Sequence, residues 1–294
     1  MTLREALAAA ERRLAVAGCD TPALDARVLL GHVTGRDHAG LLAHDLDALG
    51  SGEAVFEALV RRREAREPIA YLTGQKEFYS VSFEVGPPVL VPRPETELLV
   101  EAGLSFLGPR AGAAVADVGT GSGAVAILLA RDSQAVVTAL DLSIDALAVA
   151  RRNAVRLLPG PARARLHFLR GNLTACLPGG SVDLVAANPP YLTDEEMRTA
   201  SPELAFEPRI ALDGGTADGL GVVRELIADA RRILRPGGRL LCEIGVRQGD
   251  AVVEVASALG FVAAEVLRDL EGRPRLFSAD APESGGEPGV TGRG

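Results

Sequence analysis

Apolar residues follow a helical spacing in the first part of the chain. Leu3, Leu7 and Ala10 recur three and four positions apart, which places their side chains on one face of a helix. No strand-like alternation interrupts this region. The pattern predicts a small α-helical bundle over residues 1–73.

The next segment has a different pattern. One apolar series runs from Phe78 to Val85 and a second from Val89 to Val91. Both are typical of short strands, with Gly86-Pro87-Pro88 as the turn between them. We therefore expect a β-hairpin linker over residues 74–92.

From Ala111 onward, short apolar runs typical of strands alternate with helical stretches, which indicates a mainly parallel sheet covered by helices. The expected strands are 114–118, 135–140, 166–169, 182–187 and 240–244. The expected helices are 124–131, 144–155, 220–234 and 251–259. We assign residues 93–280 to this α/β domain, which ends in an antiparallel pair of strands at 261–267 and 275–279. Residues 281–294 are rich in Pro, Glu, Ser and Gly, so we expect a disordered tail.

Composition narrows the classes of function. The chain has 294 residues, 47% of them hydrophobic, and its 31 basic residues are outnumbered by 39 acidic ones. The net charge of −8 disfavours a direct nucleic-acid substrate held through its phosphates. Apolar runs such as 124–130 are too short to cross a membrane. The three cysteines are far apart, which disfavours a metal site and favours a cytoplasmic location.

A glycine-rich loop follows the first expected strand of the α/β domain. Its residues are Gly119, Thr120, Gly121, Ser122 and Gly123. Glycines there allow the backbone to turn sharply and to approach a ligand closely. Asp141 ends the next expected strand, where a carboxylate can accept both ribose hydroxyls of a nucleoside. A tight turn without a ligand would explain the loop alone, but the loop and Asp141 together favour a nucleoside cofactor.

The loop does not suit every nucleoside. It lacks the Gly-Lys-Ser/Thr ending of a triphosphate-binding loop, and its third glycine comes one residue too early for a dinucleotide. Asp117, just before the loop, suits a cationic ligand such as a sulfonium better than a pyrophosphate. The loop resembles motif I of the Rossmann-like methyltransferases that use S-adenosyl-L-methionine. That resemblance implies a Rossmann-like fold, with S-adenosyl-L-homocysteine as the product.

The motif Asn188-Pro189-Pro190-Tyr191 ends an apolar run. Proline fixes φ and lacks a backbone N–H, so the segment presents carbonyl groups without a competing donor. The Asn188 side-chain oxygen and the Pro189 carbonyl can hold both hydrogens of a planar NH2 group and direct its nitrogen at a methyl carbon. Tyr191 can pack on the planar group. The alternative is a proline-rich turn with no chemical role.

This tetrad resembles the motif of methyltransferases that modify planar amines, which are adenine amines in nucleic acids or glutamine amides in proteins. The tetrad alone does not choose between them. Residues 66–83 and 89–97 resemble the linker region of the bacterial release factor glutamine methyltransferases, also called PrmC or HemK. Further matches run to about Leu276, and they include Glu207-Pro208, Gly214-Gly215, Glu243-Ile244-Gly245 and Gln248.

The family resemblance implies an activity and a set of site residues. The family transfers methyl from S-adenosyl-L-methionine to the glutamine amide nitrogen of the Gly-Gly-Gln motif in class I peptide chain release factors, which makes these factors the expected protein partners. The implied cofactor positions are the loop 119–123, Asp141 and Asn188. The implied substrate positions, with Asn188, Pro189 and Tyr191 as the catalytic ones, are Asn188, Pro189, Pro190 and Tyr191. The bundle is then expected to dock the substrate.

One position departs from the common pattern of such enzymes. An acidic residue often faces the adenine amino group after the third strand, but this chain has Asn172 and Leu173 there. The Asn172 carbonyl can still accept a hydrogen bond without supplying charge, and Leu173 can pack on the adenine ring. We therefore include both among the expected cofactor residues.

Three rival functions share some of these features. A glutamine methyltransferase of a large-subunit ribosomal protein is closely similar, although the run Pro92-Arg-Pro-Glu-Thr-Glu97 matches the release-factor enzymes better. A nucleic-acid adenine methyltransferase would need a basic recognition surface, and a binding module without activity would not need both motifs. Two residues keep open roles. Arg93 is either a structural ion-pair partner or a substrate-positioning residue, and Glu243 is either a structural acid or part of the site.

Overall fold

A computed structural model describes residues 1–283, and residues 284–294 of the expected disordered tail lie outside the described part. The chain forms two compact units. One contains residues 1–76, 85–87 and 201–206, and the other contains the remaining described residues. No helix among the described residues is long and apolar enough to cross a membrane.

The first unit is the expected helical bundle. Thr2 and Glu5 form a capping box at its first helix, which satisfies backbone N–H groups that a helix start leaves unpaired. Its core contains fully buried leucines and valine, including Leu14, Leu29 and Val60. The helices are α1 (Leu3–Val16), α2 (Pro22–Thr34), α3 (His38–Ala43), α4 (Glu53–Glu64) and α5 (Ile69–Thr73).

A buried ion-pair cluster joins the segment 201–206 to the helices of this unit. Arg63 is only 5% exposed and pairs with Asp25 at 2.8 Å and with Glu203 at 2.9 Å. Arg66 also pairs with Glu203, at 2.7 Å. Burial raises the pKa of Glu203, but its hydrogen bonds from Arg66 and Arg63 outweigh this and lower the pKa to about 2. The carboxylate is therefore ionised at neutral pH and holds the segment.

The hairpin exists, but our placement of its turn was wrong. The strands are β1 (Gln75–Phe78) and β2 (Val81–Glu84), so the turn falls at Tyr79 and Ser80, whose φ values are 51° and 57°. Two successive left-handed residues are typical of a type I′ turn, which usually contains Asn or Gly. This turn has neither, so it carries no sequence signal. Residues 89–91 form no strand.

The second unit contains a seven-stranded sheet with the order β5-β4-β3-β6-β7-β9-β8. All pairs are parallel except β7 with β9 and β8 with β9. This confirms the expected mainly parallel sheet and its antiparallel end. The strands are β3 (Ala114–Val118), β4 (Val136–Asp141), β5 (Leu166–Arg170), β6 (Val182–Ala187), β7 (Leu234–Glu243), β8 (Val262–Arg268) and β9 (Pro274–Asp280).

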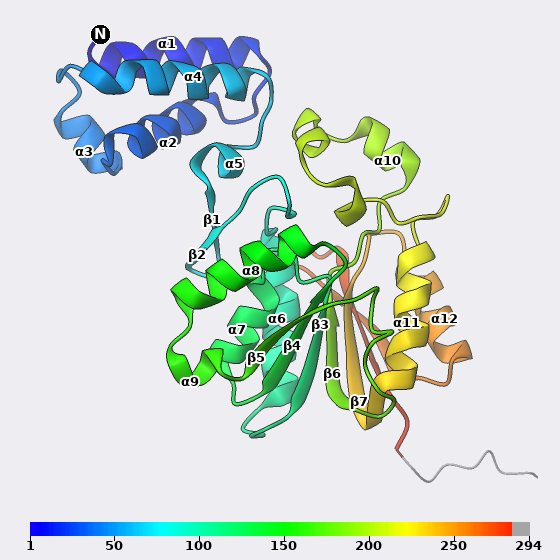
Figure 1. The fold of residues 1–294 in the computed structure, drawn as a ribbon. Helices are drawn as coiled ribbons and strands as arrows, with labels where there is room; N and C mark the ends of the chain where they lie inside the picture. The colour runs from blue at the N-terminus through cyan, green and yellow to red at the C-terminus, as the bar shows by residue number, and fades with distance from the viewer. Residues whose placement is uncertain (284–294) are drawn as a thin grey trace, which may run out of the picture. The chain divides into compact units, whose positions relative to one another are not determined.

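Helices cover both faces of this sheet (Figure 1). The neighbouring residues Leu184 and Val185 of β6 belong to different core clusters, because successive side chains of a strand point to opposite faces. The first cluster includes α6 and α7, and the second includes α11 and α12. The helices are α6 (Glu97–Leu107), α7 (Ala124–Asp132), α8 (Ile144–Leu157), α9 (Gly160–Arg163), α10 (Asp194–Thr199), α11 (Gly221–Ile233) and α12 (Gly249–Ala258).

The strand order reverses between β3 and β6. From β3 the chain continues outward to β4 and β5, and then returns to β6 on the other side of β3. In open parallel sheets, ligands bind beyond the carboxyl ends of the strands at such a reversal. Gly119 follows β3 and Asn188 follows β6, so the fold brings the two candidate motifs to this point.

Candidate active site

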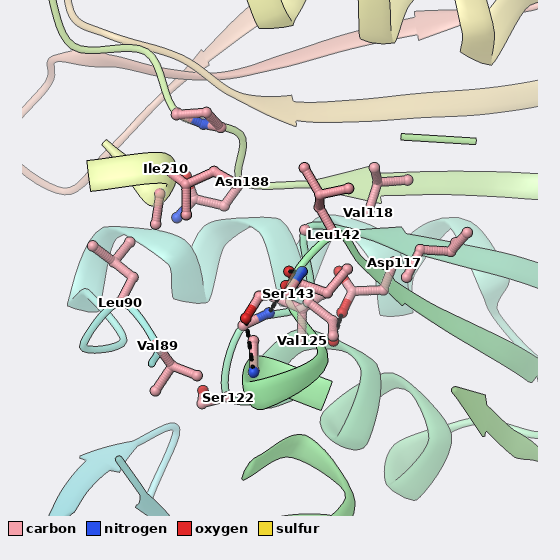
Figure 2. Close-up of a pocket in the computed structure, with 18 of the residues that line it drawn as sticks. Val89, Leu90, Asp117, Val118, Ser122, Val125, Leu142, Ser143, Asn188 and Ile210 are labelled. Atoms are coloured by element: carbon pink, nitrogen blue, oxygen red, sulfur yellow. Dashed lines mark hydrogen bonds between the residues drawn. The ribbon is translucent and has the colours of Figure 1, made fainter. Parts of the chain in front are cut away.

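A pocket lies at the carboxyl edge of the sheet in the second unit, and most of the predicted site residues line it. Figure 2 shows Leu90 and Ile210 on the side of the pocket that holds Asn188, with Asp117 on the other side. The predicted residues that line it are Gly119, Thr120, Gly121, Ser122, Asp141, Asn172, Leu173, Asn188 and Pro190. Gly123, Pro189 and Tyr191 are not among its lining residues.

The glycine loop takes a backbone conformation that explains its composition. Gly119, Gly121 and Gly123 have φ values of 74°, 54° and 81°, which residues with a side chain rarely adopt. A Cβ at Gly123 would also lie 3.0 Å from the Cβ of Ala150. Gly123 therefore allows α7 to pack on α8, while the other two glycines keep side chains out of the pocket.

Asp141 ends β4 beside this loop. Its two carboxylate oxygens accept hydrogen bonds from the backbone N–H groups of Gly121, at 2.9 Å, and Ser143, at 2.8 Å. Burial raises its pKa, and these backbone donors oppose the rise. Each carboxylate oxygen can accept more than one hydrogen bond, so the group can still bind a ligand hydroxyl.

Asp117 is the acid that precedes the loop, and its carboxylate supports the loop and α7. Its Oδ2 accepts from the Thr120 hydroxyl at 2.6 Å and from the Ala126 backbone N–H at 3.2 Å. The second bond satisfies one of the N–H groups left unpaired at a helix start. Burial raises the pKa of Asp117 to about 7, despite the lowering effect of these bonds.

Asn172 and Leu173 line the pocket. They stand at the position where such enzymes often have an acidic residue. Leu173 has a φ of 47°, an uncommon conformation for a residue with a branched side chain. The Asn172 carbonyl accepts from the Ala175 backbone N–H at 3.2 Å. A carbonyl oxygen has two lone pairs, so one remains for a ligand.

The Asn-Pro-Pro-Tyr segment leaves the sheet directly after β6. Asn188 and Pro190 face the pocket, whereas Pro189 is buried and Tyr191 packs against the core cluster of α11 and α12. The amide of Gln248 donates to the Tyr191 carbonyl at 3.0 Å. A Cβ at Gly219 would approach the same carbonyl to 2.2 Å. The close backbone packing explains why a glycine is required there.

A hydrogen-bonded chain connects Asn188 to a buried acid. The Asn188 Nδ2 donates to Thr96 Oγ1 at 3.1 Å, and the Thr96 hydroxyl donates to Glu243 Oε2 at 2.7 Å. The Tyr191 hydroxyl donates to Glu243 Oε1 at 3.2 Å. Burial raises the pKa of Glu243, while the Thr96 bond and the charge of Arg275 oppose the rise. Burial and the neighbouring Glu243 raise the pKa of Tyr191.

The chain matches two family models and many known proteins. Residues 5–74 match the model of the PrmC N-terminal domain, and residues 115–205 match a methyltransferase domain. A release factor glutamine methyltransferase of Moorella thermoacetica is 45% identical over 95% of this chain and 98% of its own. One from Cereibacter sphaeroides is 44% identical over 96% of this chain and 99% of its own.

The chain belongs to the release factor glutamine methyltransferase family. The crystal structure of a methyltransferase from Pyrococcus furiosus covers 78% of this chain and 99% of its own, with a TM-score of 0.52 and 18% identity. That likeness supports the Rossmann-like methyltransferase fold.

Two residues support the site although the sequence did not indicate their role. Asn153 is fully buried on α8, and its amide donates to the carbonyls of Glu84 and Ser122, each at 2.9 Å. It therefore ties β2 to the glycine loop. A polar residue on the buried face of a helix was the available signal.

The second residue is Glu207, which the sequence marked as a family match without indicating its role. Its carboxylate accepts from the Val91 backbone N–H at 3.0 Å and pairs with Arg93 at 2.5 Å. These bonds hold the segment that contains Leu90, which lines the pocket. They also favour the structural role of Arg93 over substrate positioning, because its charge is already paired.

We predict that Asp117→Asn changes the pH dependence of stability. A pKa of about 7, against the ordinary value of 3.8, means that the folded state holds this proton more tightly than the unfolded state. The contribution of Asp117 to stability is therefore complete below 3.8 and is lost as pH rises through 7. In urea unfolding, the free energy of unfolding of Asp117→Asn, relative to that of the wild type, should be higher at about pH 8 than at about pH 5. An equal difference at both pH values would contradict the assignment.

Proposed function

We propose that this protein transfers a methyl group from S-adenosyl-L-methionine to the side-chain amide nitrogen of the glutamine in the Gly-Gly-Gln motif of class I release factors. The observation that carries the proposal is Asn188, whose side chain faces the pocket directly beside the glycine loop. Membership of the glutamine methyltransferase family supports the amide as the group that is modified. The proposal also places the reaction in the cytoplasm, where release factors act on ribosomes.

The residues around the loop fit a nucleoside with a cationic sulfur. The loop backbone is free of side chains at Gly119 and Gly121, and Asp141 can accept ribose hydroxyls. The bound cofactor would supply an electrophilic methyl group on a sulfonium. We propose that it is held by Gly119, Thr120, Gly121, Ser122, Asp141, Asn172, Leu173 and Asn188, while Gly123 acts through the packing of α7 on α8 that shapes the loop.

An amide nitrogen is a poor nucleophile because its lone pair is delocalised into the carbonyl group. We propose that the Asn188 side-chain oxygen and the Pro189 carbonyl accept its two hydrogens and so turn the nitrogen toward the methyl group. The same oxygens stabilise the positive charge that develops as the new N–C bond forms. With the cofactor bound, the bond between its sulfur and the methyl carbon would break as the N–C bond forms, which would leave S-adenosyl-L-homocysteine. The extra proton would pass from the nitrogen to water, and the amide would return to its neutral form.

The remaining substrate contacts follow from the same segment. Pro190 lines the pocket and offers an apolar surface to the glutamine side chain. Tyr191 stays a predicted substrate-binding residue, although its ring packs on the core cluster of α11 and α12 outside the pocket lining and its hydroxyl shares the Glu243 carboxylate with Thr96. Its ring is therefore fixed within the same network as Asn188.

The relatives favour the release factor over the rival substrates. The ribosomal-protein alternative shares the amide chemistry, but the two relatives described above are named for release factors. The net charge of −8 again disfavours a nucleic-acid substrate. We further propose that residues 1–73 dock the release factor, with residues 74–92 as linker and 93–280 as the catalytic domain.

Asp141→Ala should weaken binding of S-adenosyl-L-methionine by about 1–3 kcal/mol, the loss expected for hydrogen bonds to a charged group. Titration calorimetry would measure the change. Asp141→Asn is the matched control, because it keeps the side-chain volume and one acceptor oxygen, and it should bind with intermediate affinity. Unchanged affinity in the alanine variant would remove Asp141 from the cofactor site.

Asn188→Ala should reduce turnover by about 10²–10³-fold, the size expected for loss of one preorganised transition-state contact. Asn188→Asp should be no better, because it loses the Nδ2 donor that Thr96 accepts and places a second carboxylate near Glu243. Single-turnover methylation of a Gly-Gly-Gln substrate would measure both. Wild-type turnover in the alanine variant would refute the proposed role of this residue.

Deleting residues 1–72 should separate docking from chemistry. The pocket is lined entirely by residues from 78 onward, so the shortened protein should keep its affinity for S-adenosyl-L-methionine and its rate on a short Gly-Gly-Gln peptide. Its kcat/KM on an intact release factor should fall, because a protein substrate needs a larger contact surface. An undiminished rate on the intact factor would exclude a docking role for the bundle.

A further inference from the structure

We propose that Thr96 and Glu243 are positioning residues for methyl transfer, which fix the orientation of the Asn188 side-chain amide. The inference rests on the proposed function, in which Asn188 contacts the substrate amide. It starts from the chain of hydrogen bonds that runs from the Glu243 carboxylate through the Thr96 hydroxyl to Asn188. Neither Thr96 nor Glu243 needs to touch the substrate in order to act in this way.

The fold brings the three residues together from separate elements. The parallel register pairs Ala187 of β6 with Cys242 of β7, so Asn188 and Glu243 emerge at the same edge of the sheet. Thr96 lies directly before α6, and its side chain is buried. We call this chain of hydrogen bonds from Glu243 through Thr96 to Asn188 the relay. It is built on the ends of two neighbouring strands and one helix.

The chemistry of the relay gives it a single direction. An ionised carboxylate accepts hydrogen bonds and cannot donate, and a hydroxyl has one hydrogen. The Thr96 hydrogen is used for Glu243, at 2.7 Å, so Thr96 can interact with Asn188 only as an acceptor. Asn188 must then donate through Nδ2, at 3.1 Å. Its Oδ1, which is the acceptor that a substrate NH2 requires, is left without a role in the relay.

The bonding pattern of Glu243 sets this direction, because its Oε2 accepts from Thr96 and its Oε1 accepts from Tyr191. Glu243 is 2% exposed, and burial, the largest influence, raises its pKa. Two hydroxyl donors, from Thr96 and Tyr191, and the positive charge of Arg275 favour the ionised form, whereas the charge of Glu95 disfavours it. A neutral side chain at this position could donate to Thr96 and so reverse the relay.

The direction matters because the two ends of an amide have nearly the same shape. A rotation of the Asn188 amide by half a turn would exchange Oδ1 and Nδ2 at little steric cost. Its NH2 group would then face the NH2 group of the substrate, and two donors cannot bond to each other. Packing alone cannot prevent this rotation, whereas a hydroxyl that can only accept does prevent it.

The direct test replaces the hydroxyl and keeps its shape. Thr96→Val should lower kcat for a Gly-Gly-Gln substrate by about tenfold, which corresponds to one lost hydrogen bond, with a smaller change in KM. Thr96→Ser should recover most of this loss because it restores the hydroxyl. Thr138→Val, in the middle of β4, is the matched control for the same exchange outside the pocket lining.

A double-mutant cycle shows whether Thr96 acts through Asn188. In an Asn188→Ala background, Thr96→Val should have almost no further effect on single-turnover rate, since there is no amide left to orient. A residue with a purely structural role would lower the rate by the same factor in both backgrounds. Thermal unfolding and cofactor affinity, measured on each variant, identify any loss of folding.

Glu243→Gln tests the direction of the relay with almost no change in volume. The new amide can either accept from Thr96 or donate to it, so the direction is no longer fixed, and kcat should fall by at most the amount seen in Thr96→Val. Wild-type kcat in Thr96→Val, failure of Thr96→Ser to recover activity, or full additivity in the cycle would each overturn the relay. A wild-type protein that does not methylate the Gly-Gly-Gln substrate would instead refute the proposed function.

Discussion

The reversal of strand order between β3 and β6 is the constraint on which the site depends. It places the glycine loop after β3 directly beside the Asn-Pro-Pro-Tyr segment after β6. Neither segment could perform the proposed chemistry alone, because we assign the nucleoside to one and the planar amide to the other. Gly119 and Asn188 are far apart in the sequence, but the parallel topology brings them together. The surrounding helices then hold the two strand ends rigidly.

The residues behind the pocket are as informative as those that line it. Most buried polar side chains have hydrogen-bond partners, and at this site several of the partners belong to the functional segments. Asn153 holds the glycine loop, Glu207 holds the segment before Arg93, and Gln248 holds the Tyr191 carbonyl. Glu243 differs from these three, because its bonds lead to side chains of the site through Thr96 and Tyr191.

Much of the fold was predictable because local and global signals agree. The strands 114–118 and 182–187 have the predicted bounds, since short apolar runs between polar turns have few other solutions. The start of β7 was missed because Arg235-Pro236-Gly237-Gly238 contains typical strand breakers, although β7 begins at Leu234. The hairpin turn was misplaced because Tyr79 and Ser80 give no turn signal.

The site was predictable only in part. Motifs identified the pocket residues that lie in continuous runs, such as the glycine loop and the segment from Asn188. They did not reveal that Thr96 joins Asn188 to Glu243, because Thr96 and Glu243 are 147 positions apart. Hydrogen bonds between distant residues depend on register and side-chain direction, and a single sequence encodes neither of these locally. The open role of Glu243 could therefore be addressed only from the structure.

The most direct test of the account is a crystal structure of this protein with S-adenosyl-L-homocysteine and a Gly-Gly-Gln peptide. We predict that the glutamine amide nitrogen lies within hydrogen-bond distance of both Asn188 Oδ1 and the Pro189 carbonyl oxygen, with Asn188 Nδ2 still bonded to Thr96. The account would be contradicted by a glutamine amide that binds away from Asn188, or by a Thr96 hydroxyl that no longer contacts the Asn188 amide.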